Sequence, residues 1–124
     1  MREVRLSRSH GDFQPGNVLL DGEGCLTLID WEETDIRSSC YDAMVFSLSA
    51  RFPSGLSGRV HAFLKDGASL PDELAIFGLS RAELVSLWLC EDIIWRLTTS
   101  SRSGIRELPP EMAVYFRETL SMKL

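Results

Sequence analysis

The sequence has few of the residues that build metal clusters or disulfide frameworks. It holds three cysteines, Cys25, Cys40 and Cys90, and two histidines, His10 and His61, among 124 residues. An odd cysteine count without a Cys-x-x-Cys pair argues against a disulfide framework and against a cysteine zinc site. Two histidines are too few for a histidine-rich metal cluster. We therefore expect buried free thiols and a reducing compartment.

Long apolar runs and a basic charge are also missing. No stretch approaches the roughly 20 apolar residues of a transmembrane helix. The N-terminal residues lack the apolar core of a signal peptide. The net charge is −5, from 13 basic and 18 acidic residues. Nucleic acids and anionic membranes attract basic surfaces, so we expect neither as a partner and predict a cytoplasmic protein.

Two strands joined by a tight turn are the clearest regular structure near the start of the chain. Residues 18–20 and 25–31 are mainly apolar, and residues 21–24 between them are turn formers. This pattern predicts a β-hairpin. With a two-residue turn at positions 23 and 24, Asn17 pairs with Asp30, and their Cα atoms lie about 4.5–5.5 Å apart. A slip of one residue would change the face of each side chain but leave both residues at the same end of the hairpin.

Helical periodicity replaces the strand pattern from residue 41 onward. Apolar residues recur at i, i+3, i+4 and i+7 from Tyr41, and Pro53 ends that segment. Ser80 and Glu83 form a capping box, the best helix start in the chain. A short strand is also expected within residues 3–9. The predicted helices cover residues 41–52, 59–65 and 80–98, and a last one opens at residues 109 and 110. Strands followed by helices predict the α+β class, with the hairpin packed on a mainly helical region.

Polar residues gather in the loop before the hairpin and at the end of its second strand. The loop reads His10-Gly11-Asp12-x-x-x-x-Asn17, and the strand ends in Leu-Ile-Asp30-Trp. Loops on a rigid scaffold are favoured sites of function. Mg²⁺ takes one or two protein oxygen ligands and leaves its other positions to water and phosphate. Asn17 and Asp30 are therefore candidate metal ligands.

This linked motif resembles the catalytic signature of the aminoglycoside phosphotransferase and choline kinase group, which has a protein-kinase-like fold. The resemblance implies that Asp12 is the catalytic base for a substrate hydroxyl. It implies that Asn17 and Asp30 hold Mg²⁺ bridging the phosphates of ATP. His10 and Asp42 would support the catalytic loop, Asp42 through hydrogen bonds to the loop backbone. The implied activity is ATP- and Mg²⁺-dependent transfer of the γ-phosphate to a hydroxyl of a small molecule.

The resemblance is close over residues 9–42, and the chain departs from the family before that motif. No Gly-x-Gly-x-x-Gly precedes it, and the first lysine is Lys65. A kinase-like enzyme holds the nucleotide phosphates with such a loop and lysine in an N-terminal lobe. We therefore expect residues 1–124 to form a single partial domain, the C-terminal lobe without its N-terminal lobe. Its catalytic loop and hairpin would occupy 1–41 and its helices 42–124, and we expect little or no phosphotransfer from this chain alone.

Other functions remain open from the sequence. One is a catalytically inactive, kinase-like binding or regulatory module, and another is a metal-dependent phosphohydrolase using His10, Asp12 and Asp30. Plainer roles also exist: Asp12 as a turn residue, Asn17 as a loop-ending amide and Asp42 as a first-turn helix acid. The sequence names neither the phosphate acceptor nor the oligomeric state.

Acidic residues outside the motif have two interpretations. Glu32, Glu33 and Asp35 either face a cationic substrate or form a solvated loop. Glu91 and Asp92 lie inside the long apolar helix, where we expect them on the solvent side. A role in a substrate site is the alternative for both.

Overall fold

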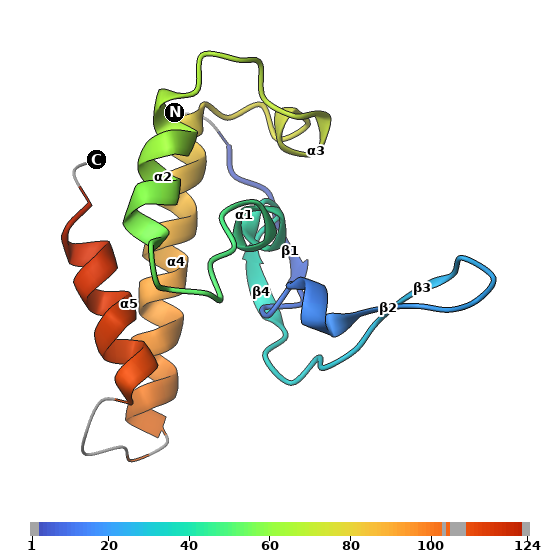
Figure 1. The fold of residues 1–124 in the computed structure, drawn as a ribbon, viewed down its shortest axis with the longest axis horizontal. Coiled ribbons are helices and arrows are strands. Elements are labelled where there is room, and N and C mark those ends of the chain that lie inside the picture. Colours follow the sequence, from blue (N-terminus) through green and yellow to red (C-terminus); the bar gives the residue numbers. More distant parts are fainter. Residues whose placement is uncertain (1–2, 103, 105–108, 123–124) are drawn as a thin grey trace.

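Small antiparallel sheets followed by helices make up the part of the chain that the structure describes. The structure is a computed structural model, and it describes residues 3–102, 104 and 109–122. Four short strands precede five α-helices in these residues. This order confirms the α+β class. Figure 1 shows α2, α4 and α5 side by side, with α1 and the strands on the other flank of α4.

The first sheet joins the start of the chain to the segment before the first helix. Strand β1 (Leu6–Ser9) pairs antiparallel with β4 (Asp35–Ser38), so that Ser9 lies opposite Asp35. Thr34 Oγ1 donates a hydrogen bond of 2.8 Å to the carbonyl of Ser9. Strand β4 has no predicted counterpart, because its sequence Asp-Ile-Arg-Ser holds little of the β-branched and aromatic character of strands. The sheet brings the loop after β1 close to the first turn of α1.

The second sheet is the predicted hairpin, with a corrected register. Strands β2 (Val18–Leu20) and β3 (Leu26–Leu28) pair Val18 with Leu28. Ile29, not Asp30, is therefore opposite Asn17, and its N–H donates to the Asn17 carbonyl at 3.0 Å. The predicted register is wrong by one residue. Asp21 N–H donates to the Cys25 carbonyl at 3.0 Å, so these two residues pair and the turn between them holds residues 22–24, three rather than two.

Asp21 explains the longer turn. Its Oδ1 accepts hydrogen bonds from the backbone N–H groups of Glu23 at 2.8 Å and Cys25 at 2.9 Å. These bonds from Cys25 and Glu23 hold the pKa of the Asp21 carboxyl below its usual value. Gly24 completes the turn with φ of 85°, a left-handed conformation that glycine adopts without strain. An aspartate that bonds its own following backbone favours this wider loop.

The hairpin extends away from the helices (Figure 1). Leu19, Leu20 and Leu26 are at least half exposed along it. The expectation of a hairpin packed on the helical region is therefore wrong for most of its length. Its base lies near α1, where the rings of Phe13 and Phe46 are 5.2 Å apart.

Four of the helices differ from the predicted ones mainly at their ends, and α3 has no predicted counterpart. Their bounds are α1 (Tyr41–Ser47), α2 (Leu56–Lys65), α3 (Asp72–Ala75), α4 (Arg81–Arg102) and α5 (Pro110–Leu120). Helix α1 is shorter than predicted, and Ser49 beyond it takes a left-handed φ of 48°. Helix α4 continues past residue 98. The capping box is confirmed, because Ser80 N–H donates to Glu83 Oε2 at 2.7 Å and Glu83 N–H to Ser80 Oγ at 3.2 Å.

The core lies where α1 and α2 meet α4, and α5 closes it. Tyr41, Met44, Leu56, Trp88 and Tyr115 are fully buried there. All three cysteines are free, but only Cys40 is buried, so the expectation of buried thiols is wrong for Cys25 and Cys90. None of the helices within the described ranges has the length and hydropathy that crossing a membrane requires.

Candidate active site

His10 fixes the start of the loop to the end of the hairpin. Its side chain is buried, and its Nε2 lies 2.7 Å from the carbonyl oxygen of Ile29. Its Nδ1 accepts a hydrogen bond of 3.2 Å from the N–H of Asp12. A ring whose Nδ1 accepts carries its proton on Nε2, which then donates to Ile29. Both ring nitrogens are thus engaged within the loop and hairpin, so neither faces a metal.

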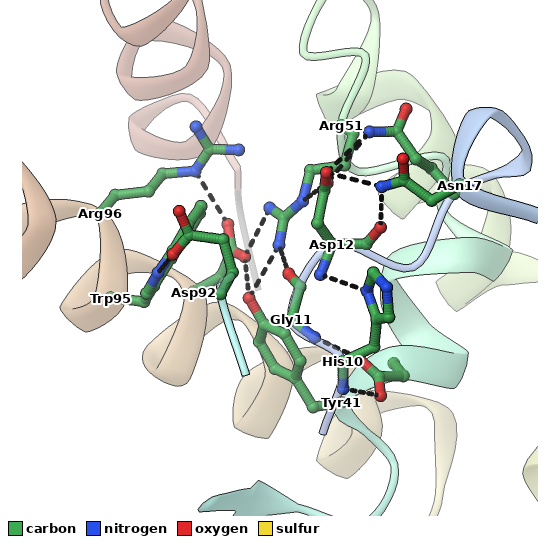
Figure 2. Close-up of polar contacts among 12 residues, drawn as sticks. His10, Gly11, Asp12, Asn17, Tyr41, Arg51, Asp92, Trp95 and Arg96 are labelled. Atoms are coloured by element: carbon green, nitrogen blue, oxygen red, sulfur yellow. Dashed lines mark hydrogen bonds and ion pairs between the residues drawn. The ribbon is translucent and has the colours of Figure 1, made fainter. Parts of the chain in front are cut away.

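Asp42 binds the loop from the first turn of α1. Its Oδ2 accepts from the N–H of His10 at 2.7 Å and its Oδ1 from the N–H of Gly11 at 3.0 Å (Figure 2). Gly11 has φ of 88°, and a Cβ at this position would lie 2.2 Å from the carbonyl oxygen of Glu33. The sequence requires glycine here for both reasons. The loop is therefore held by α1, by Ile29 after β3 and by the segment before β4 together.

Asp12 lies at the centre of a set of hydrogen-bond donors. Gln14 Nε2 contacts both carboxylate oxygens at 3.0 and 3.1 Å. Asn17 Nδ2 lies 2.9 Å from Oδ2 and also 2.9 Å from the Asp12 carbonyl oxygen. Arg51 Nε lies 3.0 Å from Oδ1. The side chain is 22% exposed.

Asn17 and Asp30 lie at the base of the hairpin. Asn17 is buried, and both hydrogen bonds of its amide use Nδ2, which leaves the amide oxygen Oδ1 as the atom suited to a metal. Asp30 is exposed and follows β3 with a left-handed φ of 64°. No group of three or more His, Cys, Asp or Glu side chains in the described residues could hold a metal ion. One amide oxygen and one carboxylate nevertheless fit the sparse protein coordination of Mg²⁺.

Sequence reasoning missed Arg51, which follows α1 and contacts the loop at two points. Beside its bond to Asp12, its Nη2 donates to the carbonyl of Gly11 (Figure 2). Its Nη1 lies 3.1 Å from Asp92 Oδ1, and its guanidinium stacks 4.6 Å from the centre of the Trp95 ring. The side chain is only 8% exposed. A lone arginine after a helix carries no sequence signal for such a position.

Asp92 is fully buried, so its expected place on the solvent side of α4 is wrong. Tyr41 donates to its Oδ1 at 2.5 Å, Tyr115 to its Oδ2 at 2.6 Å, and Arg96 Nε lies 3.1 Å from Oδ2. Burial raises the pKa of Asp92, but Arg51 and Arg96 outweigh it and hold this pKa below its usual value. The signal was present in the spacing, because Asp92 follows Trp88 by four residues on the buried face of the helix.

Glu91 and Glu33 also bind within the protein. Glu91 accepts from the N–H of Ser38 at 2.7 Å and from its Oγ at 2.5 Å, and it is half-buried, so its expected solvent position is only partly correct. Glu33 Oε2 accepts from Trp95 Nε1 at 3.0 Å. Both carboxylates border a hollow of about 300 Å³ between α4 and the segment before β4. They tie the segment that follows the hairpin to α4.

Comparison with known families agrees with the motif. The model of the Phosphotransferase enzyme family matches residues 2–80, more than half of the 124 residues, and the chain belongs to this family. The match includes the loop, the hairpin, Asp42 and Arg51, whereas Asp92 lies beyond it. No curated protein and no solved structure gives a significant match to the chain.

Proposed function

We propose that this chain carries the phosphoryl-transfer site of an ATP- and Mg²⁺-dependent phosphotransferase. The reaction moves the γ-phosphate of ATP to a hydroxyl of a small molecule. The observation that carries the proposal is the 2.9 Å hydrogen bond from Asn17 Nδ2 to Asp12 Oδ2. It joins the base and a metal ligand in one loop and turns the Asn17 oxygen away from Asp12. Membership of the phosphotransferase family supports the same assignment.

Asp12 is the residue that orients the substrate hydroxyl and accepts its proton. A positioned general base contributes roughly 10²–10⁴-fold to a rate. The Asp12 side chain keeps a solvent-facing part, from which a hydroxyl can approach the carboxylate. His10 and Asp42 hold the backbone on either side of Gly11, so the carboxylate starts from one fixed place. Phosphoryl transfer depends on such positioning more than on covalent chemistry by the protein.

Asn17 and Asp30 are the residues that would hold Mg²⁺, through one amide oxygen and one carboxylate. When bound, the ion neutralises charge on the phosphates of the nucleotide. The backbone of Asp30 is left-handed, a conformation uncommon outside glycine, which aspartate adopts more readily than most other residues. Such conformations gather at functional sites, where the surrounding structure holds them.

The phosphohydrolase alternative does not suit the geometry of His10. It would use His10, Asp12 and Asp30 as metal ligands, but both nitrogens of the His10 ring are bound to Asp12 N–H and the Ile29 carbonyl. The inactive module remains the alternative function, and metal binding separates it from the proposal.

Calorimetric titration with Mg²⁺ and Mg-ATP tests the proposal. Asp30→Asn removes the proposed carboxylate ligand, and Asp21→Asn is the matched control at the opposite end of the same hairpin. We expect the wild type and Asp21→Asn to bind alike, and Asp30→Asn to bind at least about tenfold more weakly, since loss of even an outer-shell partner costs 10–100-fold. Equal affinity of all three proteins, or no binding by the folded wild type, would overturn the proposal.

A further inference from the structure

We propose that Arg51 is a positioning residue for Asp12, and that Asp92 of α4 keeps Arg51 in its working orientation. The inference rests on the proposed role of Asp12 in phosphoryl transfer. It gives α4 and α5 a part in setting the catalytic loop, although both helices lie beyond the residues that match the family.

Arg51 fixes the Asp12 side chain relative to its own loop backbone. Its Nε binds the carboxylate of Asp12, and its Nη2 binds the carbonyl of Gly11, the preceding residue. A guanidinium presents its N–H groups in one rigid plane. Two bonds from this plane therefore hold a side chain and a neighbouring carbonyl in one relative orientation. A lysine, with one flexible ammonium, cannot make this pair of contacts in the same way.

The other contacts of Arg51 leave a single N–H group for Asp12. Arginine and carboxylate often form a bidentate pair through two parallel N–H groups. Here Nη1 is directed to Asp92 at 3.1 Å, and Nη2 to the Gly11 carbonyl and the Tyr41 hydroxyl, so only Nε reaches Asp12. Asp12 Oδ2 is left to Asn17 and Gln14. The arrangement holds the carboxylate in place, and the Asp12 side chain stays 22% exposed, so a substrate hydroxyl can still approach it.

Asp92 is itself held in place by several contacts. The carboxylate of Asp92 is fully buried and receives hydrogen bonds from Tyr41 of α1 and Tyr115 of α5. Arg96 also pairs with it, and the guanidinium of Arg96 stacks on the Tyr115 ring at 3.6 Å. Two carboxylates, Asp12 and Asp92, thus face two guanidiniums, and the cluster carries no net charge. Removal of the Asp92 charge would take away one of the two carboxylates that hold Arg51.

The test follows the side-chain amide resonances of Asn17 and Gln14 by NMR, because both amides donate to Asp12. The variants are Arg51→Lys and Asp92→Asn. The matched control is Arg59→Lys, because Arg59 lies in α2 and, among the described residues, its hydrogen bonds go to the backbone carbonyls of residues 48, 49, 52 and 54. We expect both amide pairs to shift in the two variants and to stay near their wild-type positions in the control.

Rescue by a small cation separates positioning from general stability. Arg51→Ala with added methylguanidinium should recover the wild-type resonances of Asn17 and Gln14, while urea at the same concentration should not. Unmoved resonances in Arg51→Lys, or equal shifts in Arg59→Lys, overturn the inference. If Asp92→Asn does not fold, Arg51→Lys and the methylguanidinium rescue of Arg51→Ala still test the role of Arg51.

These readouts need no metal and no nucleotide, so they do not depend on phosphotransfer. If the Asn17 and Gln14 resonances shift as expected but the chain binds no Mg-ATP, only the proposed function is contradicted. A chain that binds Mg-ATP with unmoved resonances would contradict only the role of Arg51 and Asp92.

Discussion

Tyr41 and Tyr115 donate hydrogen bonds to the two oxygens of one buried carboxylate, at 2.5 Å to Oδ1 and 2.6 Å to Oδ2 of Asp92. They are the two tyrosines of the chain. Tyr41 opens α1 and Tyr115 lies in α5, so Asp92 of α4 links three helices. A buried carboxylate that receives two hydroxyls and two guanidiniums is fully compensated, and loss of any partner leaves a costly buried charge.

Alkaline titration provides the first prediction. Burial, followed by the charge of Asp92, raises the pKa of both Tyr41 and Tyr115 above the ordinary value for tyrosine. A raised folded-state pKa gives stability that is complete below the unfolded pKa of about 10 and falls as the pH rises above it. We expect no tyrosinate absorbance near pH 10 while the circular dichroism remains native. A tyrosine that ionises at about pH 10 in the folded chain would contradict the buried network.

Asp92→Asn should strongly destabilise the protein. The change leaves Arg51 and Arg96 facing a neutral group, and loss of one partner of a buried ion pair costs about 3–5 kcal/mol. Asp66→Asn is the control, because its 3.5 Å pair with Arg81 is half exposed on the Asp66 side and such pairs contribute about 0–1 kcal/mol. Urea denaturation measures both free energies of unfolding. Equal losses of unfolding free energy in Asp92→Asn and Asp66→Asn would contradict the importance of the buried Asp92 ion pairs.

Asp92 should also make the stability of the protein depend on pH in the acid range. The folded-state pKa of Asp92 is lowered, so its contribution is present above the unfolded pKa of about 3.9 and is lost as the pH falls below it. We expect the unfolding free energy of the wild type to fall in this acid range. The slope should be shallower in Asp92→Asn, measured by urea denaturation at several pH values. Parallel slopes would show that Asp92 does not titrate as described.

Gly11→Ala and Gly24→Ala form a matched pair. Both glycines have positive φ, of 88° and 85°, but only Gly11 has a neighbour that a Cβ would strike, the Glu33 carbonyl at 2.2 Å. The left-handed backbone alone costs roughly 1–2 kcal/mol for an alanine. We therefore expect Gly24→Ala to lose about that much and Gly11→Ala clearly more, with shifted amides in the loop. Similar losses in both variants would contradict the tight packing of the loop against Glu33.

The sequence predicted the local elements better than the contacts between them. The hairpin and the capping box at Ser80 follow from neighbouring residues, whose propensities act within a few positions. The register failed because the side chain of Asp21 selects a wider turn. Helix α1 ends early despite a good apolar period, and β4 forms because β1 pairs with it, which no local pattern shows.

The residues of the candidate site also fall into two groups, those predicted from the local sequence and those brought together by packing. His10, Asp12, Asn17, Asp30 and Asp42 were found because they lie in one linked motif. Arg51 and Asp92 are 41 residues apart, and their meeting depends on how α1 packs against α4. Only the four-residue spacing from Trp88 marked Asp92 as a buried position.

A map of backbone amide shifts on titration of the folded chain with Mg-ATP tests the proposed metal and nucleotide site most directly. We expect shifts centred on Asp12, Asn17 and Asp30, and their loss in Asp30→Asn. Shifts of the same size in Asp30→Asn, shifts centred elsewhere, or no shifts in the well-folded wild type would contradict the proposed site.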